Sequence, residues 1–280
     1  MKYEGKIAFV AGGSTGMGRA IAAELAKRGA HVLLIARNRE NLQEAKKHVA
    51  ESASSGTSKV ETLSLDVSDP KQVAEGLGAS IQRMGVPDIV INCAGFAYPA
   101  YFEDIPYDRF RAMLDVNVGG VWNVLQAVIP KMKERGSGHI ATISSIVGFM
   151  SFVGYSGYSI TKFGLCGLFE SLRNELKPFG IQAHVLLAPD TDTPGFAEEN
   201  KSKPHETHVV SGKSKLYSPE EVAVAFMKGI EKKSLYIHIG FGRTIHFLFR
   251  HAPWLVRSIT DSDYRKARKT AAQGRAGATA

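Results

Sequence analysis

Apolar segments rich in β-branched residues recur along the chain, and stretches with the apolar spacing of a helix separate them. Six of these segments are continuous enough to be strands buried on both faces, which is typical of a parallel sheet covered by helices. The six segments, and a shorter seventh, begin at Lys6, His31, Val60, Asp88, Gly138, Ile181 and Ser234. Because strand and helix alternate without a break, the pattern predicts one α/β domain with a doubly wound parallel sheet.

Length and composition agree with this prediction. The chain has 280 residues, of which 44% are hydrophobic and 22% are charged, as is ordinary for a folded domain with one large core. We expect residues 1–240 to form that domain and residues 241–280 to form an extension. Cys93 and Cys166 lack the spacing of a metal site or a disulfide framework, so no metal is expected. The first strand follows Met1 closely and leaves no room for a signal peptide, which predicts a cytosol-facing protein.

The extension carries most of the net charge. Of the formal charge of +8, +6 lies after residue 242, where there are eight Lys and Arg residues and two acids. Arg243, Arg250 and Arg257 are seven residues apart, which predicts one face of an amphipathic helix that Pro253 interrupts. The apolar runs are shorter than the roughly 20 residues of a transmembrane span. Two interpretations fit: peripheral contact of residues 243–269 with an anionic membrane, or a helix that covers a substrate cleft or a subunit interface. No nucleic-acid-binding module accompanies the charge, so nucleic acid is not an expected partner.

A glycine-rich loop follows the first predicted strand. Gly12, Gly16 and Gly18 lie between this strand and the first helix, where glycines let the backbone approach a pyrophosphate and the helix terminus supplies N–H donors. This position predicts a dinucleotide-binding loop. We expect the other residues of the loop to share in cofactor binding; they are Ser14, Thr15 and Met17.

The end of the second strand indicates which dinucleotide binds. An NAD site usually has an acid there to accept from the ribose 2′-hydroxyl, but this strand is followed by Arg37, with Arg39 nearby. A guanidinium binds a 2′-phosphate with paired hydrogen bonds, so the sequence predicts NADP(H). Asp66, followed by Val67, fits a carboxylate that accepts from the adenine amino group, or equally a cap for the next helix. Asn92 and Gly95 close the fourth strand with small residues, where the backbone must lie near a cofactor.

Three further residues predict the chemistry. Tyr158 and Lys162 are four residues apart in a helical pattern and so project from one face, and Ser145 lies thirteen residues before Tyr158 at the end of the fifth strand. A phenol with a pKa of about 10 is a weak acid–base catalyst at neutral pH, and we expect the Lys162 ammonium, together with the positive nicotinamide of an oxidised cofactor, to lower that pKa. Tyr158 would then protonate the oxygen of a carbonyl that accepts hydride, while Ser145 hydrogen-bonds the same oxygen. Asn117 lies inside a helical run, where it either holds a water or a neighbouring backbone group or is a buried structural Asn.

Together these residues resemble the short-chain dehydrogenase/reductase family over residues 6–193. The resemblance implies a Rossmann-type sheet of about seven strands and a catalytic tetrad of Asn117, Ser145, Tyr158 and Lys162. It also implies that Lys162 binds the nicotinamide ribose and that Asn117 supports a water-linked proton relay. Family members usually associate through helices that flank the active site, so we expect a homo-oligomer. An apolar stripe suited either to that contact or to covering the sheet consists of Leu165, Phe169, Leu172 and Leu176.

The sequence departs from the family pattern at two places. Ala11 stands where a threonine is common, and Pro189-Asp190 replaces the usual Pro-Gly after the sixth strand. Pro189 and Thr193 remain expected cofactor contacts.

The segment 189–200, within an expected substrate loop at 189–215, resembles reductases that use NADPH on long-chain amino ketones of sphingolipid synthesis. We therefore expect a cytosol-facing protein that is peripheral at a membrane, which would be the endoplasmic reticulum in a eukaryote. Asp190 or Asp192 would then pair with the substrate ammonium; alternatively, Asp192 or Thr193 only caps a helix that begins at Pro194. Other functions fit the same residues: reduction of another apolar carbonyl, such as a β-ketoacyl thioester or a steroid, or non-catalytic binding of NADP or lipid.

Overall fold

A seven-stranded sheet forms the centre of the molecule, for which the computed structural model describes residues 3–53, 58–212 and 214–278, with side chains up to residue 270. The strand order is β3-β2-β1-β4-β5-β6-β7, and all neighbouring strands are parallel. The strands are β1 (Ile7–Ala11), β2 (His31–Ala36), β3 (Val60–Ser64), β4 (Ile89–Asn92), β5 (Gly138–Ser145), β6 (Ile181–Ala188) and β7 (Tyr236–His238). The predicted doubly wound sheet is confirmed. Its order reverses between β1 and β4, where sheets of this kind bind ligands at the carboxyl ends of the strands.

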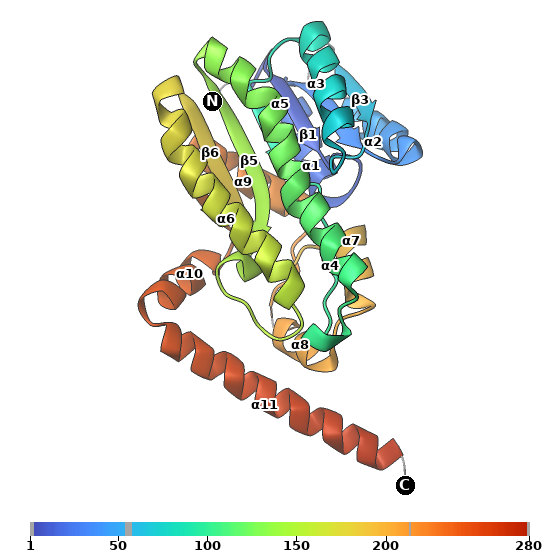
Figure 1. Ribbon diagram of the computed structural model, residues 1–280, viewed down its shortest axis with the longest axis vertical. Helices are drawn as coiled ribbons and strands as arrows, with labels where there is room; N and C mark the ends of the chain where they lie inside the picture. Colours follow the sequence, from blue (N-terminus) through green and yellow to red (C-terminus); the bar gives the residue numbers. More distant parts are fainter. Residues whose placement is uncertain (1–2, 54–57, 213, 279–280) are drawn as a thin grey trace.

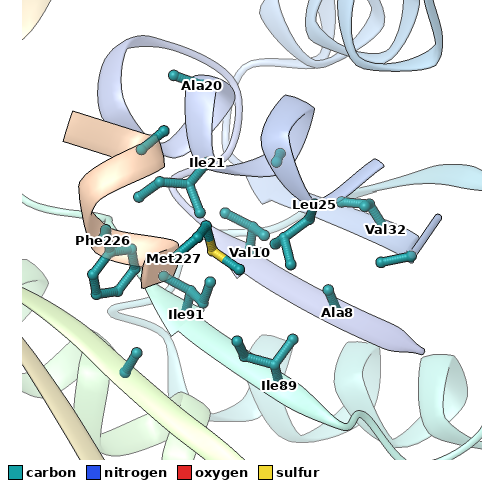
Figure 2. Packing of buried hydrophobic residues seen from close by; sticks show 14 of the residues in the cluster. Ala8, Val10, Ala20, Ile21, Leu25, Val32, Ile89, Ile91, Phe226 and Met227 are labelled. Carbon is teal, nitrogen blue, oxygen red and sulfur yellow. The ribbon is translucent and has the colours of Figure 1, made fainter. Parts of the chain in front are cut away.

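Helices cover both faces of the sheet (Figure 1). One face packs against α1 (Gly16–Lys27), α2 (Arg39–Glu51) and α9 (Pro219–Glu231), and the other against α3 (Pro70–Met84), α5 (Gly120–Arg135) and α6 (Ser156–Leu176). Neighbouring residues of β1 serve opposite faces: Val10 packs with Met227 of α9 in one core cluster (Figure 2), and Phe9 belongs to the other. This double burial is the reason that the strands have continuous apolar sequences.

The apolar stripe of α6 covers the sheet. Leu165, Phe169 and Leu176 are fully buried in the second core cluster, and Leu172 packs against its edge. Of the two interpretations of this stripe, the structure therefore selects the intramolecular one.

One helical run in the described part of the chain is long and apolar enough to cross a membrane, by length and hydropathy alone. It covers Tyr107–Arg135 and comprises α4 (Tyr107–Leu114), a π-helical turn (Asp115–Gly119) and α5. The inner face of α5 packs into the second core cluster beside the sheet, and 39% of the most apolar window of the run is buried.

The remaining elements gather at the carboxyl end of the sheet. They are the short helices α7 (Pro194–Asn200) and α8 (His205–Ser211), the helices α10 (Gly242–His251) and α11 (Pro253–Ala278), and the 3-10 turns Phe102–Asp104 and Ile146–Gly148. A third 3-10 turn, Lys177–Phe179, precedes β6 at the opposite, amino end. As predicted, the helix of the extension breaks at Pro253. Figure 1 shows α11 crossing the molecule beyond α8, against which it packs.

Candidate active site

The glycine loop between β1 and α1 has the close backbone approach of a dinucleotide cradle. Gly12 has φ of +75°, and a Cβ there would lie 2.5 Å from the amide nitrogen of Ala94. A Cβ on Gly18 would lie 2.1 Å from the carbonyl oxygen of Gly12. Because both neighbours are backbone atoms, a side chain at either position would force the loop apart. Thr15 precedes the first turn of α1, so the N–H groups of that turn lie at the carboxyl edge of the sheet. These residues fit the pyrophosphate of a dinucleotide.

The segment after β6 closes over this loop. A Cβ on Gly16 would lie 3.0 Å from Cγ2 of Thr193, so the two residues are in contact range. Thr193 is the N-cap of α7, and its hydroxyl accepts a hydrogen bond of 3.0 Å from the N–H of Phe196. Of the two capping candidates, the cap is therefore Thr193. Asp192 is exposed and does not line the cleft, whereas Asp190 does.

The end of β2 presents a basic surface. Arg37 has a side chain that is 71% exposed and forms a 3.5 Å ion pair with Asp66, and Arg39 is exposed in the first turn of α2. Burial acts to raise the pKa of Asp66, but hydrogen bonds from Ser68, with help from Arg37, lower it below its usual value. Asp66 does not cap α3, since Asp69 holds that position.

Small and buried residues line the floor of the cofactor region. Val67 is buried against Gly120, where an added Cβ would lie 2.6 Å from a Val67 methyl carbon. Asn92 is buried at the end of β4 and donates to the carbonyl oxygen of Ala141 at 3.4 Å. Gly95 lines the cleft, and a Cβ there would lie 3.0 Å from Oδ1 of Asn117.

Asn117 is fully buried in the π-helical turn between α4 and α5. Its side-chain oxygen accepts from the N–H of Phe96 at 3.0 Å, and its amide nitrogen donates to the carbonyl oxygen of Phe96 at 2.9 Å and to Thr161 at 3.1 Å. This side chain ties the loop after β4 to α6. Both interpretations hold in part, because Asn117 is buried with its hydrogen bonds satisfied and also holds the backbone of Phe96.

Ser145, Tyr158 and Lys162 meet in one cleft. Ser145 ends β5, and its Oγ accepts from the N–H of Val147 at 3.3 Å. Tyr158 and Lys162 project from one face of α6, and the Lys162 ammonium lies 5.3 Å from the centre of the Tyr158 ring. Lys162 is buried and donates to the carbonyl oxygen of Ile143 at 2.7 Å, which holds it at the end of β5.

The charges around the phenol correct one prediction. We expected Lys162 to lower the pKa of Tyr158, but that pKa is raised by burial and by the carboxylates of Glu199 and Asp190. Burial also lowers the pKa of Lys162 to about 8. Burial and the two carboxylates hold the pKa of Tyr158 above its ordinary value, so Tyr158 keeps its proton at neutral pH. A protonated phenol suits a group that donates to a reduced carbonyl oxygen.

Sequence reasoning missed a buried charged cluster beside Tyr158. Glu199 of α7 lines the cleft, accepts a hydrogen bond from the hydroxyl of Tyr155, and forms a 3.2 Å ion pair with Lys203. The side chain of Lys203 is only 1% exposed, and its ammonium lies 4.6 Å from the centre of the Phe196 ring. Tyr155 could have been found three residues before Tyr158, but nothing in the sequence indicates which of the adjacent residues Glu198 and Glu199 faces inward.

The cleft has a volume of about 330 Å³. Its walls come from β5, α6, the segment after β6, α7, α8 and the extension, which contributes Ile245 of α10 and Thr260 and Asp263 of α11. Because these three residues belong to the extension, the extension covers part of the cleft, which agrees with one of the two interpretations of its sequence.

Within the described residues, no group of three His, Cys, Asp or Glu side chains is placed to hold a metal.

Comparison with known proteins agrees with this geometry. Residues 6–204 match the short chain dehydrogenase family. The chain is 42% identical to a 3-dehydrosphinganine reductase of Danio rerio, over 81% of this chain and 69% of the relative. It is 38% identical to a 3-ketodihydrosphingosine reductase of Bos taurus, over 82% of this chain and 70% of the relative. The crystal structure of levodione reductase superposes with a TM-score of 0.76 at 27% identity, covering 86% of this chain and 98% of the other. The chain therefore belongs to the short-chain dehydrogenase family and is an oxidoreductase that uses a nicotinamide cofactor.

Proposed function

We propose that the protein uses NADPH to reduce the C3 ketone of 3-ketodihydrosphingosine to the alcohol, a step of sphingolipid synthesis. The observation that carries the proposal is the pair of carboxylates, Asp190 and Glu199, in the same cleft as Tyr158. The substrate is an amino ketone whose ammonium lies next to the reacting carbonyl, so a negative site beside the catalytic phenol matches it. The names of the relatives support the same substrate.

The bound dinucleotide would supply the hydride. The chain's own residues do the rest. The glycine loop and Thr193 would hold the cofactor, with Pro189 beside them in the cleft wall. Lys162, held at the end of β5, would bind the nicotinamide ribose, Ser145 would hydrogen-bond the carbonyl oxygen, and Tyr158 would donate its proton to that oxygen. Asn117 holds the loop after β4 in place.

The choice of NADPH over NADH rests on Arg37 and Arg39. Both side chains are exposed at the end of β2, where a 2′-phosphate would lie. Replacing both by alanine should raise KM for NADPH by about 10-fold or more, because one hydrogen bond to a charged group contributes about 1.5–3 kcal/mol net of its exchange with water. KM for NADH should change little. An equal rise for both cofactors would contradict the assignment.

The electrostatics of the cleft favour Asp190 as the contact for a substrate cation. Asp190 and Glu199 lie near the buried ammonium of Lys203, and the buried ammonium of Lys162 also interacts with Glu199. Burial and the Glu199 carboxylate raise the pKa of Asp190, and Lys203 opposes them. A substrate ammonium would allow Asp190 to ionise, so we assign the substrate contact to Asp190 and not to Asp192.

The test of the proposed function is NADPH oxidation with 3-ketodihydrosphingosine, measured beside a β-ketoacyl thioester. We expect kcat/KM to be at least tenfold higher for the amino ketone. A preference for the thioester would instead assign the protein to reductases of other apolar carbonyls.

We further propose that the protein lies on the cytosolic surface of a membrane through its extension. Exposed apolar side chains on α10 and α11 lie among the arginines Arg243, Arg250 and Arg257; they include Phe247, Trp254, Leu255 and Ile259. Such a surface fits an anionic interface.

In a flotation experiment, vesicles that contain anionic lipid should carry the wild-type chain upward with them. The amount of a Phe247→Ser/Trp254→Ser variant that floats with the vesicles should be at least fivefold lower. Exposed Phe179 lies outside the extension, so Phe179→Ser serves as the control; equal flotation of all three would contradict the proposal.

Self-association remains a proposal as well. The sheet-covering stripe of α6 is unavailable for it, but Trp122 of α5 and Ile160 of α6 are exposed. We therefore place the contact on the outer faces of α5 and α6. Light scattering of the wild type against Trp122→Glu measures it, and a monomeric wild type would contradict it.

A further inference from the structure

A second cavity lies next to the catalytic cleft, and the two share lining residues. This cavity, called the outer groove below, has a volume of about 320 Å³ and is lined in part by Phe149, Phe163, Phe249 and Val256. Met150 and Thr260 line both the outer groove and the catalytic cleft. The two hollows are therefore neighbours separated by one layer of side chains.

The extension lines both cavities with one face of each of its helices. On α10, Ile245 lines the cleft, and Phe249, one helical turn later, lines the outer groove. On α11, Asp263 lines the cleft, Thr260 lines both cavities, and Val256 lines the outer groove. The path from Asp263 to Val256 is about 10 Å along the helix axis at 1.5 Å per residue.

The segment after β5 also lines both cavities. Ser145, Ile146 and Val147 line the cleft, Phe149 lines the outer groove, and Met150 lines both. The Phe149 ring packs edge-on against Phe249 at 6.2 Å between ring centres, which joins this segment to α10. The segment after β5 and the extension therefore enclose the boundary between the two cavities.

The chemistry changes along this path. The cleft end holds Tyr158 and the carboxylates Asp190 and Glu199, and the outer groove offers three phenylalanines and a valine beside the polar residues Ser151, Arg257 and Thr260. The guanidinium of Arg257 lies 5.6 Å from the centre of the Phe249 ring. A ligand that fits both cavities has a cationic, carbonyl-bearing head and an apolar tail.

We propose that the outer groove is the binding site for the alkyl chain of the substrate and that the extension forms its roof. The proposal rests on the proposed reduction of a long-chain amino ketone and adds where the chain lies. The continuity of the two cavities commits the groove to this occupant, since a chain attached at the reacting carbonyl meets Met150 and Thr260 first. The exposed apolar residues of α11 lie on the same helix as Val256 and Thr260, so the chain can enter from the membrane side of the molecule.

The test is the dependence of kcat/KM on chain length in a homologous series of 2-amino-3-ketones. For the wild type we expect a rise of about fourfold for each added methylene that enters the groove, equivalent to about 0.8 kcal/mol. Val256→Trp fills the groove, so the ratio of kcat/KM between the longest and the shortest ketone should fall at least tenfold. Phe249→Ala removes one apolar wall and should lower the same ratio severalfold.

Ser258→Trp is the matched control, because Ser258 is exposed on α11 two residues from Val256 and lines neither cavity. It should keep the wild-type ratio. A wild-type ratio in both Val256→Trp and Phe249→Ala would overturn the proposal, and if Val256→Trp does not fold, the ratio in Phe249→Ala decides alone. A wild type that reduces none of the ketones would instead overturn the proposed function.

Discussion

Replacing Tyr158 by phenylalanine should lower kcat for ketone reduction about 10²- to 10⁴-fold, the usual contribution of a positioned general acid. The change removes only the hydroxyl that would donate a proton to the carbonyl oxygen. The phenylalanine ring should keep the packing of the tyrosine ring. The centre of the Tyr158 ring lies 6.0 Å from the centre of the Tyr155 ring and 5.3 Å from the ammonium nitrogen of Lys162. NADPH affinity, measured by fluorescence titration, should therefore change less than threefold.

Tyr155→Phe provides the comparison for this variant. Tyr155 is also a buried phenol in the cleft, but its hydroxyl is engaged with Glu199. We expect Tyr155→Phe to keep a kcat well above that of Tyr158→Phe. If Tyr158→Phe retained near wild-type kcat, the catalytic assignment would be wrong.

Replacing Asp190 by asparagine should lower kcat/KM for the amino ketone about 30-fold or more, because breaking a buried charge pair costs about 2–5 kcal/mol. The des-amino ketone should lose at least tenfold less. Asp190 also raises the pKa of Tyr158, so its removal alters the phenol for both substrates. Dividing the loss of kcat/KM for the amino ketone by the loss for the des-amino ketone removes this shared effect on the phenol. The quotient then measures the contact between Asp190 and the ammonium.

Asp192 offers a control two residues away. It is exposed and does not line the cleft, so Asp192→Asn should leave both substrates near wild-type rates. Equal losses for the amino and des-amino ketones in Asp190→Asn would refute the ammonium contact. A selective loss in Asp192→Asn would move the contact to that residue.

Much of the cofactor and catalytic site could be predicted because its residues are neighbours in the sequence. Gly12 and Gly18 share one loop, and Tyr158 and Lys162 share one helical face through their spacing of four. Ser145 could be placed because it ends a strand, and the ends of parallel strands meet at one edge of the sheet. In each case local geometry is enough to bring the groups together.

The pKa of Tyr158 could not be predicted in this way. Sequence spacing identified the cation one helical turn away, Lys162, but the phenol also faces Glu199 and Asp190 from elements that come later in the chain. Burial adds to the effect of these carboxylates. The sign of a pKa shift depends on all charges around the group and on the water excluded from it, and neither can be read from one helix.

The sequence by itself determined the sheet, the glycine loop and the catalytic spacing, because these depend on periodicity and on contacts between near neighbours. It also located the break at Pro253, since proline cannot continue the hydrogen bonding of a helix. Only the tertiary structure decided that Asp190 and not Asp192 faces the cleft, that Glu199 and Lys203 form a buried pair there, and that α10 and α11 line part of the cleft. These features join segments far apart in the chain, and such contacts depend on how the helices pack at the end of the sheet.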